Sequence, residues 1–145
     1  MMQKDNRTIA FVCTGNTCRS PMAEAIFNDM AEKNGVCVRA ESFGIATSTG
    51  LPVSENSVIA CKEIGIDISG KASTAVADAG IEKYEKFYCM SQSHAKMLMQ
   101  FFLVQPEKIA VLGISDPYGG NIDVYRHCRD EIVNSVKEIL KAYEN

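Results

Sequence analysis

Short apolar segments alternate along this chain with longer stretches in which apolar residues recur at helical spacing. Residues 8–12, TIAFV, form a continuous run typical of a strand buried on both faces of a parallel sheet. Further strands are expected at 36–43, 86–90 and 108–112, and helices at 21–34, 54–64, 91–102 and 121–143. Because strands and helices alternate, we expect an α/β fold: a single three-layer domain, residues 1–145, with a four-stranded parallel sheet and helices on both faces.

Capping residues set several of the expected helix ends. Ser20 can cap a helix that Pro21 opens, and Asn34-Gly35 is a natural stop for that helix. Ser54 is expected to cap the second helix. These signals place one helix directly behind the loop that follows the first strand.

Two candidate catalytic residues follow predicted strands. Cys13 comes directly after the first strand, and Asp116 follows the fourth. Ligands of open α/β sheets bind beyond the carboxyl ends of the strands. We therefore expect Cys13 and Asp116 to lie at the same edge of the sheet.

The segment after the first strand has the composition of an anion-binding loop. It reads CTGNTCRSP, from Cys13 to Pro21, and its small and turn-forming residues allow successive backbone N–H groups to point inward. The helix N-terminus adds further N–H groups and partial positive charge, which favour a phosphoryl group and the thiolate of a cysteine at the centre. Arg19 can bind two phosphoryl oxygens with its planar guanidinium. We predict a nucleophile, Cys13, in a phosphate-binding loop whose backbone runs through Thr14, Gly15, Asn16, Thr17 and Cys18.

Other side chains of this loop have more specific expected roles. The Ser20 hydroxyl can hydrogen-bond the thiolate, as well as capping the helix. Asn16 is expected to hold a left-handed backbone conformation, which asparagine tolerates better than most residues. Cys18 is either close enough to form a reversible disulfide with an oxidised Cys13 or a small buried thiol without a role.

The segment Asp116-Pro117-Tyr118-Gly119-Gly120 supplies a candidate general acid. A leaving group needs a proton, and Asp116 is expected to donate it and then to activate water. Tyr118 is expected to form one wall of the pocket. Taken alone, an Asp-Pro pair indicates an ordinary turn, so this interpretation depends on the cysteine loop.

Cys13-x5-Arg19-Ser20 together with Asp116-Pro117-Tyr118 resembles the low-molecular-weight protein tyrosine phosphatase family, over essentially the whole chain. The resemblance implies hydrolysis of phosphotyrosine through a cysteinyl-phosphate intermediate, with phosphorylated proteins as partners and no metal or other cofactor. Lys71 stands where the family usually has a histidine that braces the phosphate loop, which puts the bracing in question. Phe43 and Ile45 replace smaller residues of the usual Ser-Ala-Gly-Thr stretch, while Ser42 is retained to support Asn16.

One loop residue points to a different substrate. Thr17 occupies a position that is usually aliphatic in tyrosine-selective members, and threonine there resembles the protein arginine phosphatase branch. The two glycines after Tyr118 also resemble that branch, although it usually has phenylalanine in place of Tyr118 itself. The alternative is therefore a phosphatase acting on phosphoarginine.

Two other function classes are less favoured. A thiol-dependent arsenate reductase needs two further cysteines close together in a later segment, where this chain has Cys89 alone. A non-catalytic phosphopeptide-binding module would have lost the thiol or the acid, but both are present.

Composition limits the partners and the compartment. The 145 residues include 15 basic and 18 acidic side chains, a net charge of −3, which argues against a nucleic-acid-binding surface. No segment is apolar enough to span a membrane, and the first seven residues are too polar for a signal peptide. The spacing of the six cysteines suits reduced thiols, and hence a cytoplasmic enzyme, better than a zinc site or a disulfide framework. A monomer is favoured, although the sequence leaves the oligomeric state open.

The remaining cysteines and the histidines are expected to be structural. Cys37, Cys61, Cys89 and Cys128 fall on predicted strands or apolar helix faces, so we expect them in the core. His94 and His127 are expected on helix surfaces.

Overall fold

A computed structural model describes residues 7–144. The elements, in chain order, are β1 (Arg7–Cys13), α1 (Arg19–Lys33), β2 (Val38–Gly44), α2 (Glu55–Lys62), α3 (Val76–Ala79), η1 (Ile81–Lys83), β3 (Lys86–Cys89), α4 (Gln92–Phe102), η2 (Pro106–Lys108), β4 (Ile109–Val111) and α5 (Ile122–Lys141). The four expected strands and four main helices are all present. The sequence pattern missed the short helical turns α3, η1 and η2, which are too brief to show a helical period.

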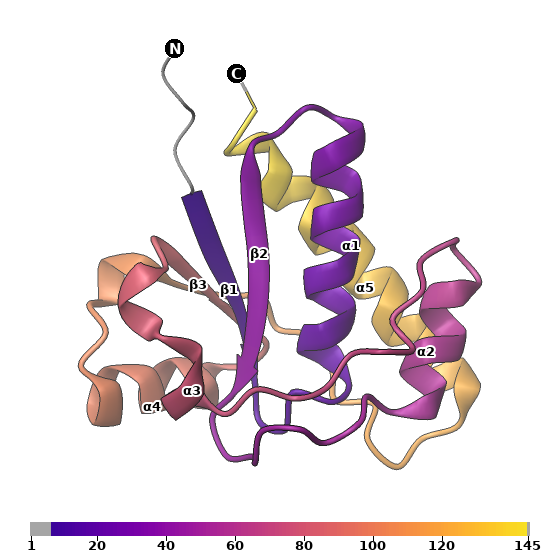
Figure 1. The fold of residues 1–145 in the computed structure, drawn as a ribbon, viewed down its shortest axis with the longest axis horizontal. Helices are drawn as coiled ribbons and strands as arrows, with labels where there is room; N and C mark the ends of the chain where they lie inside the picture. Colours follow the sequence, from indigo (N-terminus) through magenta and orange to yellow (C-terminus); the bar gives the residue numbers. More distant parts are fainter. Residues whose placement is uncertain (1–6, 145) are drawn as a thin grey trace.

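The four strands form one parallel sheet in the order β2-β1-β3-β4. Helices α1, α2 and α5 lie together on one side of it, and α3 and α4 lie on the other (Figure 1). The expected three-layer α/β fold is confirmed. From β1 the chain first passes to β2 and then returns across β1 to reach β3, so the strand order reverses at β1. Ligand sites of such sheets lie where the order reverses, and here Cys13 ends β1.

Each face of β1 is buried in a separate apolar core. Phe11 packs with Phe27 of α1 and Tyr88 of β3 on one side, while Ala10 and Val12 face the other. On that second side Phe43, one of the departures from the family pattern, packs against Tyr84 and Phe87 with ring centroids 6.0 and 6.2 Å apart. Burial on both faces explains why the first strand is continuously apolar.

Two boundary predictions need correction. Helix α1 begins at Arg19, so Ser20 lies inside the helix and does not cap it; Cys18 occupies the N-cap position without a side-chain cap. The Ser20 hydroxyl is instead turned toward Cys13. Strand β2 begins at Val38, which leaves Cys37 in the preceding turn, and Cys37 is exposed rather than part of the core.

Other local predictions hold. Ser54 caps α2 by accepting a hydrogen bond from the backbone N–H of Ser57. Gly35, just after α1, has the left-handed φ of 68° that favours glycine at such a stop. Cys61, Cys89 and Cys128 are buried as expected. Within residues 7–144, no helix is both long and apolar enough to cross a bilayer.

Candidate active site

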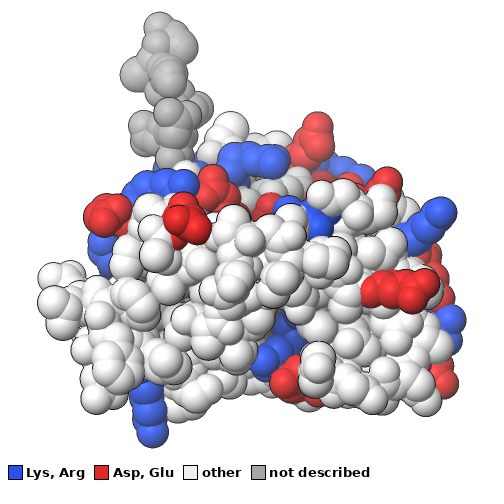
Figure 2. All heavy atoms as spheres, turned by 60° about the horizontal axis from the view of Figure 1, so that its bottom comes forward, with Lys and Arg blue, Asp and Glu red and all other residues white. Residues whose placement is uncertain are grey.

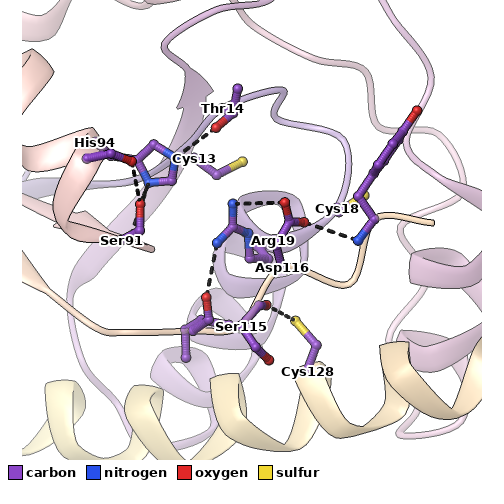
Figure 3. A network of polar contacts seen from close by, with 12 residues as sticks. Cys13, Thr14, Cys18, Arg19, Ser91, His94, Ser115, Asp116 and Cys128 are labelled. Carbon is purple, nitrogen blue, oxygen red and sulfur yellow. Dashed lines mark hydrogen bonds and ion pairs between the residues drawn. The ribbon is translucent and has the colours of Figure 1, made fainter. Parts of the chain in front are cut away.

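The loop from Cys13 to Arg19 and the loop that carries Asp116 meet at the carboxyl edge of the sheet (Figure 3). Between them lies a cavity of about 300 Å³, lined by Cys13, Thr14, Gly15, Asn16, Thr17, Cys18, Arg19, Asp116 and Tyr118. The lining includes all the predicted site residues except Ser20, whose hydroxyl lies 2.8 Å from the Cys13 sulfur. In Figure 2, which turns the lower edge of Figure 1 forward, charged side chains gather along the upper border and much of the face below them is uncharged. Arg19 and Asp116 are the charged residues of the cavity lining.

The Cys13 thiol lies at the floor of this cavity and is 3% exposed. Its sulfur accepts a hydrogen bond from the backbone N–H of Asn16 at 3.2 Å and lies 2.8 Å from the Ser20 hydroxyl. The Asn16 amide nitrogen donates to the Ser20 oxygen at 2.7 Å, which leaves the Ser20 proton available for the sulfur. Both donors are directed at the sulfur that we expect to act as the nucleophile.

Asn16 holds the loop in place from the inside. Its φ is 57°, the left-handed conformation predicted from the sequence. The side-chain amide also donates to Ser42 at 3.0 Å, and its oxygen accepts from the backbone N–H of Thr74 at 2.7 Å. The loop lies so close to the end of β2 that a Cβ added at Gly44 would sit 2.7 Å from the carbonyl oxygen of Thr14. Ser42 therefore does support Asn16, as expected.

The bracing continues from Ser42 to the surface through residues that the sequence did not single out together. The Ser42 hydroxyl donates to one carboxylate oxygen of Glu24 at 2.6 Å, and the Lys71 ammonium lies 2.6 Å from the other. Lys71 thus reaches the loop through Glu24 and Ser42. The loop is therefore braced from position 71 although a lysine stands there, and Glu24 links this lysine to Ser42.

Arg19 is directed into the cavity from the first turn of α1. Its side chain is 8% exposed, and it donates to the carbonyl oxygen of Ile114 at 3.0 Å. The other terminal nitrogen lies 3.9 Å from a carboxylate oxygen of Asp116, whose side chain is 60% exposed. Asp116 also accepts a hydrogen bond from the backbone N–H of Tyr118 at 3.1 Å. An acid across the cavity from the thiol is positioned to protonate a leaving group.

His94 is a site residue that the sequence analysis misplaced. We expected it on a helix surface, but it is 3% exposed and its Nε2 lies 2.9 Å from the Thr14 hydroxyl oxygen (Figure 3). Burial, together with the charge of Arg19, lowers the pKa of His94 to about 4. The available signal was its spacing: Ser91-x-x-His94 directly after a strand is a capping arrangement at the catalytic edge. His127, by contrast, is exposed as expected.

Cys18 is buried behind the loop, and its sulfur lies 3.5 Å from the Tyr125 hydroxyl oxygen. Burial and this contact raise the pKa of Tyr125 to about 12. All six cysteines are free thiols, so a Cys13–Cys18 disulfide stays a prediction. Within residues 7–144, no group of three or more His, Cys, Asp or Glu side chains is placed to hold a metal ion.

Comparison with known proteins places these features in a family. Residues 8–145 match the family described as low molecular weight phosphotyrosine protein phosphatase. A protein-arginine-phosphatase of Bacillus subtilis is 32% identical, over 92% of this chain and 94% of the relative. An arsenate reductase of Brevibacillus brevis is 31% identical, over 97% and 99%. The crystal structure of a low molecular weight protein tyrosine phosphatase from T. tengcongensis is 32% identical, covers 94% of this chain and 99% of its own, and superposes with a TM-score of 0.89.

Proposed function

The chain belongs to the low molecular weight phosphotyrosine protein phosphatase family, whose members are hydrolytic phosphatases, and from this premise we propose that Cys13, Arg19 and Asp116 carry its reaction. The substrates are phosphorylated proteins. The observation that supports this assignment best is the Cys13 thiol, held by two donors at the floor of a cavity that also receives Arg19.

In the first step, the Cys13 thiolate attacks phosphorus in line with the leaving group. The S–P bond forms as the bond from phosphorus to the leaving group breaks, and Asp116 gives its proton to the departing atom. Backbone N–H groups of the loop and the Arg19 guanidinium bind the phosphoryl oxygens as charge shifts onto them. Thr14, Gly15, Thr17 and Cys18 contribute to this binding through the loop backbone.

In the second step, the Asp116 carboxylate takes a proton from water, and the water oxygen attacks phosphorus. The S–P bond breaks, phosphate leaves, and the thiolate is restored. The Ser20 hydroxyl, 2.8 Å from the sulfur, stabilises the departing thiolate. Asp116 and Cys13 thus both return to their starting protonation states.

Acid quenching during turnover tests the assignment. With p-nitrophenyl phosphate, whose acidic leaving group depends little on a proton from Asp116, the Asp116→Asn variant should accumulate the intermediate because breakdown lacks its base, and peptide mapping should find phosphate on Cys13. The matched control is Cys128→Ser, which alters a buried thiol of α5 outside the cavity lining. It should leave the labelling unchanged. Phosphate on any other residue contradicts the nucleophile assignment.

A second candidate substrate, phosphoarginine, is favoured by Thr17. This residue lines the cavity beside Cys13 and offers a hydroxyl where tyrosine-selective members usually carry an aliphatic side chain. The relative named protein-arginine-phosphatase supports the same choice. Tyr118, an exposed ring at the cavity rim, instead suits a flat phenol such as that of phosphotyrosine.

The variant Thr17→Ile separates the two substrates. If Thr17 favours phosphoarginine, the variant should lower kcat/KM for a phosphoarginine protein by about tenfold or more and spare phosphotyrosine, since specificity is a ratio of these constants. Thr17→Ser, which keeps the hydroxyl, is the matched control and should retain the wild-type ratio. An unchanged ratio in the isoleucine variant would give Thr17 no role in selectivity and remove the main support for phosphoarginine.

Arsenate reduction is less well supported by the thiols. Cys89 is buried at the end of β3, and burial raises its pKa to about 12, which is unsuited to a thiol that must exchange disulfides. Cys61 and Cys128 lie on α2 and α5 with pKa values raised in the same way. A binding module without catalysis is disfavoured because thiol, arginine and carboxylate all line one cavity.

The oligomeric state, the compartment and the partners also belong to this proposal. Cys13, Arg19 and Asp116 of a single chain line the cavity together, so the proposed reaction does not require a second copy, and we propose a monomer as the active form. Six free thiols support a reducing compartment such as the cytoplasm. The excess of acidic over basic side chains, 18 against 15, argues against a nucleic-acid partner.

A further inference from the structure

His94 has a hydrogen-bonding arrangement that fixes where its proton lies. Its Nδ1 accepts a hydrogen bond from the backbone N–H of Ser91 at 3.1 Å, and a backbone N–H can only donate. The low pKa of His94 keeps the imidazole neutral at neutral pH. A neutral ring with an accepting Nδ1 carries its proton on Nε2.

The Nε2 proton determines in turn how Thr14 can bond. Nε2 lies 2.9 Å from the Thr14 oxygen and therefore donates to it. The Thr14 oxygen is then an acceptor in this contact, so its own proton is free to be donated elsewhere. Thr14 lines the cavity next to Cys13, and Figure 3 shows its oxygen facing the imidazole, with the Cys13 thiol beside the pair.

From this geometry we propose that His94 is a positioning residue for the reaction, which holds Thr14 so that its hydroxyl donates to the phosphoryl group. The inference rests on the proposed function, because it assigns a new pair of residues to the same cavity. The imidazole itself does not touch the substrate. It accepts a hydrogen bond from the Ser91 backbone N–H at the start of α4 and donates one to Thr14 in the loop after β1. His94 therefore links this loop to the α4 side of the sheet.

The placement of His94 suits this role. It is nearly fully buried, and both ring nitrogens have partners: Ser91 at the helix start and Thr14 in the loop. Asn16 braces the loop from the β2 side, whereas His94 braces it from the α4 side. Thr14 and Asn16 are thus held from opposite directions around Cys13.

A double-mutant cycle tests the proposal. Thr14→Val removes the hydroxyl at nearly constant volume, and His94→Leu removes the donor. Each should lower kcat/KM for p-nitrophenyl phosphate about fivefold to tenfold, the worth of one hydrogen bond, and weaken inhibition by inorganic phosphate to a similar extent. The double variant should be no worse than Thr14→Val alone. Additive losses overturn the proposal.

Two further variants keep the test decisive. His94→Gln places an amide N–H near the Nε2 position and should restore most of the activity lost in His94→Leu, even if the leucine variant folds poorly. Leu98→Ala truncates a fully buried side chain of α4 that is not part of the cavity lining. It should lower Tm without changing kcat/KM, because a merely structural loss moves stability alone.

The phosphate measurement distinguishes two kinds of failure. If the wild-type protein does not hydrolyse p-nitrophenyl phosphate, the proposed function fails, yet affinity for inorganic phosphate still reports on the His94–Thr14 pair. If the wild-type protein turns over normally, but the effects of Thr14→Val and His94→Leu on kcat/KM and on phosphate inhibition are additive, only the positioning role fails.

Discussion

The floor and the rim of the cavity are built in opposite ways. At the floor, Cys13, Asn16 and Arg19 are 3%, 3% and 6% exposed, and hydrogen bonds to other elements hold each of them. At the rim, the Asp116 side chain is 60% exposed and Tyr118 is 82% exposed. The bond between them is local, from the Tyr118 backbone to the Asp116 carboxylate within one turn.

This difference matches the work each region is proposed to do. Phosphoryl groups are alike in all substrates, so their binding groups gain from being fixed before the substrate arrives. Leaving groups and their surrounding protein differ, and an exposed rim can meet them without first breaking buried contacts. We therefore expect substitutions of Cys13, Asn16 and Arg19 to affect all substrates equally and rim substitutions to depend on the leaving group.

The largest effect is expected at the centre of the floor. Cys13→Ser should abolish turnover, by at least about 10⁴-fold, for every substrate, because a serine hydroxyl is not ionised by two hydrogen-bond donors at neutral pH. Initial rates with p-nitrophenyl phosphate and a phosphoprotein measure this. The variant should still bind inorganic phosphate, which shows that the loop is intact. Residual turnover near the wild-type rate contradicts the role of Cys13.

At the rim, Asp116→Ala should lower kcat/KM by about 10²–10⁴-fold for leaving groups that need a proton. The loss should shrink for leaving groups that are already acidic, such as p-nitrophenol. The measurement is the loss in kcat/KM for a series of aryl phosphates, plotted against the pKa of their leaving groups. An equal loss across the series assigns Asp116 to shaping the pocket and removes the contrast between rim and floor.

A smaller effect is expected at the outer end of the floor's bracing. Lys71→Met removes the ammonium from Glu24, which acts on Asn16 only through Ser42, so kcat/KM should fall by less than about tenfold for all substrates alike. The matched control is Lys83→Met: Lys83 pairs with Glu41 at 3.0 Å and lines the same neighbouring cavity as Glu24 and Lys71. The control should leave kcat/KM unchanged. Equal effects of the two variants would mean that the brace ends at Ser42.

Local sequence determined much of the fold and the centre of the site. The continuous apolar run before Cys13 predicts a strand buried on both faces, and β1 is one. The loop residues were identifiable because the groups that bind a phosphoryl group lie within a few positions of the nucleophile. Asn16 and Ser20 are equally local, so the left-handed conformation of one and the contact of the other with the thiol followed from short-range geometry.

Only the tertiary structure revealed the residues that support this loop from a distance. Thr14 and His94 lie 80 positions apart in the sequence, and Lys71 lies 47 positions from Glu24. We expected His94 on a helix surface because nothing in the sequence pairs it with a nucleophile. Its burial depends on how α4 approaches the loop after β1, which no local pattern encodes.

The same distinction explains the remaining errors. Cys37 is apolar by type, but strand pairing begins one residue later, at Val38 with Arg7, and leaves its side chain in the turn. Ser20 had the right residue type for a helix cap, but α1 begins one residue before it, at Arg19, and the Ser20 hydroxyl contacts the Cys13 thiol instead. The sequence alone indicated the proposed nucleophile, the proposed phosphate-binding loop and the order of strands and helices along the chain, because each depends on neighbours along the chain. The packing of distant elements decided which side chains brace that loop, because hydrogen bonds between elements exist only once the layers have assembled.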